Sequence, residues 1–148
     1  MDLKELHDKL VAEGCNRFCI EGIGQQSDDD VEQLGLNDGK WEVRYFERGR
    51  AEKTLFSTAD KDEAIRYYYN YIMKIEHWHI IAFTRSFDIF NAHKEKLEAA
   101  GIKTIQNDIP YYAGPEDRVY RLFVTNKDIF KAREIFDVVP YYDENLKR

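Results

Sequence analysis

The chain has 148 residues, of which 43% are hydrophobic and 34% charged, a composition typical of a soluble globular protein with one core or two small lobes. Its net charge of −6 argues against nucleic acid as a direct ligand, because binding to phosphates requires a basic surface. The sequence contains neither an apolar run of bilayer-spanning length nor a basic-then-apolar leader, so we expect a cytoplasmic protein that does not bind membranes.

The first predicted element is an amphipathic helix from Asp2 to Glu13, which ends before Gly14. Its apolar stripe consists of Leu3, Leu6, Leu10 and Val11. A strand from Arg17 to Ile23 is expected next. Cys15 and Cys19 would be more than about 10 Å apart on an extended segment, which is too far for a disulfide bond. We therefore expect two reduced thiols in the core.

A polar stretch from Gln25 to Gly39 is predicted to be a surface loop, with a helical turn at Val31 to Leu34. It carries four closely spaced acidic residues, Asp28, Asp29, Asp30 and Glu32. A charge run of this kind is either a solvated face or a patch that docks a basic protein. The spacing does not match the Asp-x-Asp-x-Asp-Gly pattern of a calcium loop, so no metal site is predicted here.

The stretch from Lys40 to Gly49 has the strict alternation of a strand with one buried and one exposed face. Trp41, Val43 and Tyr45 fall on one side, and Glu42, Arg44 and Phe46 on the other. A turn signal at Asn37-Asp38-Gly39 precedes this strand, and Thr54 to Phe56 offers a second short strand for an antiparallel hairpin. No residue of this hairpin has an evident catalytic role, which favours a binding scaffold.

A second helix is predicted from Lys61 to Ile75, with Asp60 as its N-cap. Its core-facing positions are Ala64, Tyr68, Tyr71, Ile72 and Ile75. The three consecutive tyrosines at positions 67 to 69 cannot all face inward, because neighbouring residues lie about 100° apart around a helix. At least one of them must reach the surface, and we predict Tyr67 and Tyr69 as partner contacts because tyrosine is enriched at the centres of interfaces.

The second half of the chain alternates strands and helices. The predicted strands are 79–83, 102–106, 119–124 and 138–142, and the predicted helices are 86–100 and 126–136. A pattern recurs in this half, since Phe83 and Phe123 each end a strand that is followed by a helix opening with Asp-Ile-Phe-x-Ala. Ser86 and Asn126 are the expected N-caps of these helices. Two β-α-β units in series predict a ferredoxin-like β-α-β-β-α-β lobe.

The predicted fold class is therefore α+β. Residues 1–76 are expected to form an N-terminal lobe of a helix, the antiparallel hairpin and a second helix, and residues 77–148 the ferredoxin-like lobe. One continuous domain is the alternative to two lobes.

His77 and His79 would place both imidazoles on one face of a strand, which is compatible with a metal-binding pair. A third ligand at a matching spacing is missing, and His93 lies on the following predicted helix. The sequence contains no nucleophile motif, phosphate-binding loop or zinc signature. We therefore predict a protein without catalytic residues, metal ligands or a cofactor.

One set of motifs spans about a quarter of the chain, roughly residues 36 to 75. Trp41 opens a strand that continues through Tyr45 to Glu47-Arg48-Gly49, Phe56 follows, and Asp62-Glu63-Ala64 starts an aromatic helix. This set resembles a pattern common in bacterial polymorphic-toxin immunity proteins. The resemblance implies a cytoplasmic protein that binds a cognate toxin and neutralises it by covering its active surface.

We therefore expect an immunity protein that acts through protein–protein contact, and the acidic charge of the chain fits a basic toxin such as a nuclease. The predicted contact residues are Asp28, Asp29, Asp30, Glu32, Tyr67, Tyr69, Tyr111 and Tyr112. The alternative is a regulatory module that senses a small molecule through the ferredoxin-like lobe.

Overall fold

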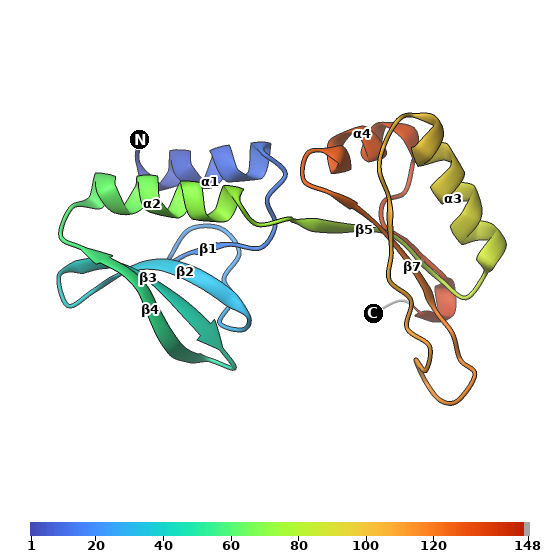
Figure 1. The fold of residues 1–148 in the computed structure, drawn as a ribbon, viewed down its shortest axis with the longest axis horizontal. Helices are drawn as coiled ribbons and strands as arrows, with labels where there is room; N and C mark the ends of the chain where they lie inside the picture. The colour runs from blue at the N-terminus through green and yellow to red at the C-terminus, as the bar shows by residue number, and fades with distance from the viewer. Residues whose placement is uncertain (147–148) are drawn as a thin grey trace. The chain divides into compact units, whose positions relative to one another are not determined.

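The computed structural model of the protein describes residues 1–146 (Figure 1). The chain divides into two compact units, Met1–Glu76, called unit 1, and a second that begins at His77, called unit 2. Within the described residues, each unit has a four-stranded sheet, two α-helices and its own hydrophobic core, so the fold class is α+β.

In unit 1, which is described in full, two helices lie over one face of the sheet (Figure 1). Its elements in chain order are α1 (Leu3–Ala12), β1 (Cys19–Ile20), β2 (Val31–Asn37), β3 (Lys40–Glu47), β4 (Arg50–Thr58) and α2 (Lys61–Met73). The strand order is β1-β2-β3-β4, with β1 parallel to β2 and the other neighbours antiparallel. The predicted helix, hairpin and second helix are therefore all present.

Two tight turns join the antiparallel strands of unit 1. Asp38 and Gly39 connect β2 to β3, and Arg48 and Gly49 connect β3 to β4, and all four residues have positive φ. Positive φ at both central residues is the mark of a type I′ turn, whose twist matches that of the flanking strands. The strand β4 is longer than the predicted stretch from Thr54 to Phe56, because it pairs with β3 from Arg50 to Thr58, with two register shifts along the ladder.

The strand β2 replaces the predicted loop and helical turn. Val31, Glu32 and Leu34 are buried in it, and it pairs with β3 over its full length. The sequence prediction was wrong here because polar residues and Gly35 mask the strand, and its stability comes from pairing with a neighbouring strand. The strand β1 is likewise shorter than predicted, since only Cys19–Ile20 pairs with β2.

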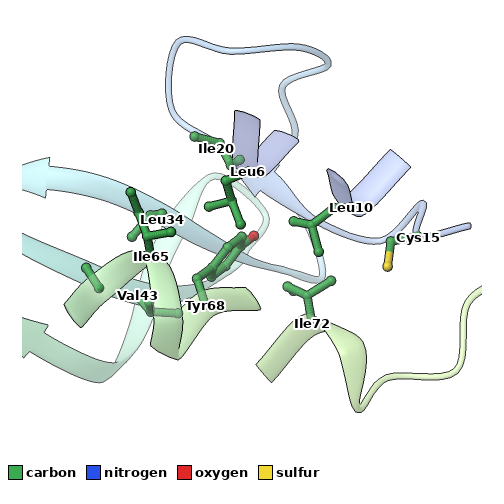
Figure 2. Close-up of a cluster of buried hydrophobic side chains, with 10 residues drawn as sticks. Leu6, Leu10, Cys15, Ile20, Leu34, Val43, Ile65, Tyr68 and Ile72 are labelled. Carbon is green, nitrogen blue, oxygen red and sulfur yellow. The ribbon is translucent and has the colours of Figure 1, made fainter. Parts of the chain in front are cut away.

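The core of unit 1 lies between the helices and the sheet (Figure 2). Its buried members include Leu6, Leu10, Ile20, Leu34, Val43, Ile65, Tyr68 and Ile72. Val11 was expected in the apolar stripe of the first helix, but it is 45% exposed. It follows Leu10 directly and so lies about 100° around the helix from that buried residue, outside the core-facing side.

The ends of both helices in unit 1 follow from local chemistry. Asp60 caps α2 as predicted, because its Oδ1 accepts hydrogen bonds from the backbone N–H groups of Asp62 and Glu63. Asp2 and Glu5 form a capping box at the start of α1. Gly14, which follows α1, adopts a positive φ of 81°, a conformation common just after helices.

Unit 2 also alternates strands and helices. Its described elements in chain order are β5 (Trp78–Thr84), α3 (Phe87–Ala99), β6 (Ile105–Gln106), β7 (Tyr120–Thr125), α4 (Asp128–Ile135), β8 (Tyr141–Tyr142) and a short 3₁₀ helix, η1 (Glu144–Leu146). Phe90 and Leu97 of α3 share a core with Leu122 and Val124 of β7. Ile102 was predicted to start a strand, but it is buried in this core after α3 instead.

The direction of β8 departs from a ferredoxin-like arrangement. The strand order is β6-β7-β5-β8, and β5 and β7 are antiparallel. A last strand that returned parallel to β7 would therefore lie antiparallel to β5. In the structure β8 is parallel to β5, with Ala82 opposite Tyr141 and Phe83 opposite Tyr142. The ferredoxin-like detail is thus not confirmed, although the order of elements is the predicted one.

The similarity between the two helix starts of unit 2 is only partial. Ser86 caps α3, since its Oγ accepts a hydrogen bond from the N–H of Ile89 at 3.2 Å. Asn126 does not cap α4, because it has a φ of 51° and its Oδ1 accepts a hydrogen bond from the N–H of His77 at 2.9 Å. The N–H of Asn126 donates to the His77 carbonyl at 2.8 Å. Asn126 therefore joins the end of β7 to the start of β5.

Candidate functional site

Hydrogen bonds link the acidic residues that precede β2 to the turn between β3 and β4. The N–H of Arg48 donates a hydrogen bond to Asp29 Oδ1 at 2.9 Å, and the N–H of Gly49 donates to the Asp28 carbonyl at 2.8 Å. Asp28, Asp29 and Asp30 all remain exposed to solvent. This stretch, Asp28–Asp30, is called the acidic segment below. It combines a fixed backbone position with exposed negative charge.

Asp30 is held from two sides. Its φ of 50° lies in the left-handed region, which aspartate tolerates better than most residues. The hydroxyl of Tyr45 donates a hydrogen bond to Asp30 Oδ1 at 3.0 Å, and this bond raises the pKa of Tyr45. Arg17 Nε donates to the Asp30 carbonyl at 3.2 Å, and Arg17 Nη2 lies 3.6 Å from Asp30 Oδ1. The acidic segment is thus tied to β3 and to the chain before β1.

Glu32 is not part of that exposed surface, since only 5% of it is accessible. Its carboxylate accepts hydrogen bonds from Arg17 Nη2 at 2.8 Å and from the Tyr71 hydroxyl at 2.7 Å. Glu32 was predicted as a partner contact, but its burial leaves it little accessible surface for one. Because side chains alternate along β2, Glu32 turns toward α2 and anchors Arg17 and Tyr71 inside unit 1.

Two tyrosines of α2 donate hydrogen bonds to the strands beneath them. Tyr68 lies in the middle of the core (Figure 2), and its hydroxyl donates to the carbonyls of Glu32 and Cys19 at 2.6 and 3.0 Å. Burial raises the pKa of Tyr68. Burial and, next, the hydrogen bond to Glu32 raise the pKa of Tyr71 to about 12. Both hydroxyls therefore remain protonated at neutral pH and act as donors.

A groove with a volume of about 560 Å³ opens beside the acidic segment. Val11, Phe18 and Val31 give it apolar surface, and Arg17, Asp29 and Asp30 give it charge. The exposure of Val11 is explained by this position. Val11 lines the groove, whereas the preceding residue, Leu10, packs in the core. The groove is the place where α1 and the acidic segment come together.

One wall of the groove is aromatic. The ring centroids of His7 and Phe18 are 5.6 Å apart, and the two rings are tilted by 59°. Gly24 approaches the imidazole so closely that a Cβ atom there would clash with His7 Nε2. The φ of Gly24, 71°, also favours glycine. The position of His7 at the groove therefore depends on a glycine at residue 24.

The two cysteines are buried, unbridged thiols, as predicted. Cys15 is one of the residues that line the groove, and its Sγ lies 3.8 Å from Met73 Sδ. Burial raises the pKa of the Cys15 thiol to about 11. The Cys15 side chain is therefore mainly a thiol at neutral pH, and the thiolate is the nucleophilic form.

Tyr67 and Tyr69 are only partly accessible. The ring of Tyr67 is stacked on that of Phe56, with centroids 4.1 Å apart. The Lys9 ammonium lies 4.6 Å from the ring centroid of Tyr69. Each ring therefore uses part of its surface for contacts within unit 1.

Tyr111 and Tyr112 belong to unit 2, in the loop between β6 and β7. Tyr111 is 71% exposed, whereas the ring of Tyr112 packs against Phe83 with centroids 5.6 Å apart. Arg85 holds the loop through two hydrogen bonds to the Asp117 carboxylate, from Nε at 2.7 Å and from Nη2 at 2.9 Å. These two predicted contacts therefore lie in a different unit from the acidic segment and the groove.

Two of the histidines that were considered as metal ligands make contacts with other residues of unit 2. His77 is buried, and its backbone N–H donates a hydrogen bond to Asn126 Oδ1. His93 Nδ1 lies 2.8 Å from the Ile89 carbonyl, and its ring is stacked on Phe136. Across residues 1–146, no group of three or more His, Cys, Asp and Glu side chains is placed to hold a metal ion.

Comparison with known proteins gave no match to a family model, to a curated protein or to a solved structure. Among the helices of residues 1–146, none combines the length and the apolar character needed to cross a membrane.

Sequence reasoning missed several residues that build the site. Arg17 and Tyr71 hold Glu32, while Val11 and Phe18 form the apolar side of the groove. Val11 and Tyr71 carry a hint in the sequence, since Val11 stands at the edge of the apolar stripe of its helix and Tyr71 at a predicted core-facing position. The others depend on contacts between distant segments, which no local pattern reveals.

Proposed function

We propose that the protein is a non-catalytic immunity protein, which binds a cognate bacterial toxin in the cytoplasm and neutralises it by covering the active surface of the toxin. The observation that carries this proposal is the acidic segment, where three exposed aspartates lie on a backbone held by Arg48 and Gly49. A segment that is already ordered loses little conformational entropy when a partner binds. The adjacent groove adds a concave surface for a projecting group of the partner.

The distribution of charge supports a basic partner. Acidic and basic residues are equally numerous from His77 onward, so the entire net charge of −6 belongs to unit 1. Opposite charge on two partners raises their association rate and favours one orientation. A toxin that binds nucleic acid has a basic surface of the required sign. We therefore infer that unit 1 docks a basic toxin, such as a nuclease.

The test requires the toxin itself. The gene of an immunity protein is expected directly after a gene for a large secreted protein with a toxin-like C-terminal end, and that end is the partner to purify. Isothermal titration calorimetry should show stoichiometric binding, and coexpression with the protein should restore growth of cells that make the toxin. A toxin that stays fully active in excess protein, or a genome with no such neighbouring gene, would contradict the proposal.

A further inference from the structure

We propose that the groove between α1 and the acidic segment receives an arginine side chain of the partner protein. The groove joins apolar and aromatic surface to two carboxylates. An arginine side chain has the matching parts, an aliphatic stem and a flat cation at its end. This inference rests on the proposed function, and it specifies the chemical group of the toxin that unit 1 recognises.

The two carboxylates of the groove are held in place by internal hydrogen bonds and can still accept hydrogen bonds from a ligand. Asp29 Oδ1 accepts a hydrogen bond from the Arg48 N–H, and Asp30 Oδ1 accepts one from the Tyr45 hydroxyl. A carboxylate has roughly four acceptor sites, so each side chain can accept further hydrogen bonds. A guanidinium group presents five N–H donors in a planar fork, which suits two neighbouring carboxylates better than a single ammonium group does.

Arg17 also lines the groove, but its positive charge is already balanced. Arg17 Nη2 lies 2.8 Å from the buried Glu32 carboxylate and 3.6 Å from Asp30 Oδ1. The carboxylates of Asp29, Asp30 and Glu32 thus outnumber the one guanidinium among them. A second cation at the groove would reduce the repulsion between these negative charges.

The apolar and aromatic residues that line the groove offer contacts for the stem and the face of an arginine. Val11 is 45% exposed there, on a helix whose Leu6 and Leu10 are fully buried. The half-buried Phe18 ring beside His7 provides an aromatic surface on which a guanidinium can stack. Charge attracts the partner group, while these contacts are made only by a side chain that enters the groove.

The binding test uses the full chain and two synthetic peptides, tetra-arginine and tetra-lysine. In an NMR titration of the isotope-labelled protein, tetra-arginine should shift the amide signals of Val11, Phe18, Asp29 and Asp30. We expect it to bind roughly threefold or more tightly than tetra-lysine, because only guanidinium combines stacking with forked hydrogen bonds. Tighter or equal binding of tetra-lysine would overturn the assignment, as would shifts spread evenly over the acidic residues of unit 1.

Three isosteric variants separate the groove from general charge attraction. Asp29→Asn and Asp30→Asn each remove one charge but keep the oxygen that accepts the internal hydrogen bond, and asparagine tolerates the φ of 50° at position 30. Asp28→Asn is the matched control, from the same segment but outside the groove lining. We expect a loss of roughly tenfold in tetra-arginine affinity for each groove variant and less than about threefold for the control. Equal losses in all three would overturn the proposal.

A fourth variant tests the shape of the groove. Val11→Trp keeps the net charge and places a large ring in the groove from an exposed helix position, so it should abolish binding of tetra-arginine while circular dichroism and Tm stay unchanged. Retained affinity in this folded variant would contradict the proposal. Because the peptide assay needs no toxin, its outcome is separate from that of the proposed function. If the protein neutralises the toxin but tetra-arginine does not bind in the groove, only the arginine site is refuted.

Discussion

Neighbouring acidic residues have different roles in this protein, because the backbone turns their side chains to different environments. Asp28, Asp29 and Asp30 stay at the surface, while Glu32 is buried two residues further along. A buried carboxylate is tolerated only when it is paired and hydrogen-bonded. The contacts of Glu32 with Arg17 and Tyr71 meet this condition, and they join three segments of unit 1.

Tyr71→Phe tests the contribution of these contacts to stability. The variant should lower the free energy of unfolding by about 1–2 kcal/mol, because it deprives the buried Glu32 carboxylate of one donor. Tyr69→Phe on the same helix is the control. Its hydroxyl has no hydrogen bond to another described residue, and its removal should cost less than about 0.5 kcal/mol. Urea unfolding measures both values, and equal losses would show that the bond to Glu32 contributes nothing.

Tyr71 should also cause the stability of the folded protein to fall at alkaline pH. Its pKa is about 12 in the folded protein, compared with an ordinary value of 10.0. The unfolded chain therefore loses this proton first as pH rises, which favours unfolding. The stabilisation is fully present below about pH 10 and is lost progressively up to about pH 12. Tyr71→Phe should reduce this loss when Tm is recorded across that range, and an unchanged profile would contradict the assignment.

At the scale of elements, the hairpin of β3 and β4 positions the acidic segment. The turn residues Arg48 and Gly49 have φ angles of 52° and 79°, and their N–H groups donate to Asp29 and Asp28. A type I′ turn requires such angles at both of its central residues. The turn therefore sets the register of the hairpin and also fixes the place of the neighbouring aspartates.

Gly49→Ala should weaken this arrangement. Alanine at a φ of 79° is strained, and its Cβ would lie 3.4 Å from Asp28 Oδ2. We expect a loss of about 1–2 kcal/mol in the free energy of unfolding, measured with urea. Gly114→Ala is the control, because a Cβ there has no heavy atom within 4 Å and its φ is not in the left-handed region. A similar loss in both variants would show that the strained turn is not the cause.

At the scale of the whole molecule, charge distinguishes the two units. The sequence is balanced in charge from His77 onward, while unit 1 carries the entire acidic excess. Long-range attraction to a basic partner would therefore act on unit 1. Since electrostatic steering acts mainly on the association rate, kinetics are its most direct measure.

If the proposed function holds, charge reversal at Asp28, Asp29 and Asp30 should slow association with the proposed toxin roughly tenfold or more at low salt. The rate of the native protein should fall as salt rises, and that of the variant should change less, because ions screen attraction between exposed charges. Stopped-flow fluorescence measures these rates. Glu52→Lys, at an exposed position on β4, is the control for reversal of a single charge of unit 1 outside the acidic segment. Unchanged association of the triple variant at low salt would remove the acidic segment from the binding surface.

Several features of the fold could be predicted from the sequence because their causes are local. Asp60 and Ser86 accept hydrogen bonds from N–H groups two or three residues away, so the starts of α2 and α3 show in the sequence. The alternation of residues 41–46 likewise identifies β3 without knowledge of its neighbours. The α+β class follows from such patterns.

The sequence by itself determined these helices, the hairpin and the acidic segment. Only the tertiary structure decided that β2 is a strand, that Glu32 is buried, that Val11 lines a groove and that β8 runs parallel to β5. The physical reason is that a cap or an alternating pattern depends on residues close together in the chain. Strand pairing and grooves depend on contacts between residues far apart, which form only when the whole unit packs.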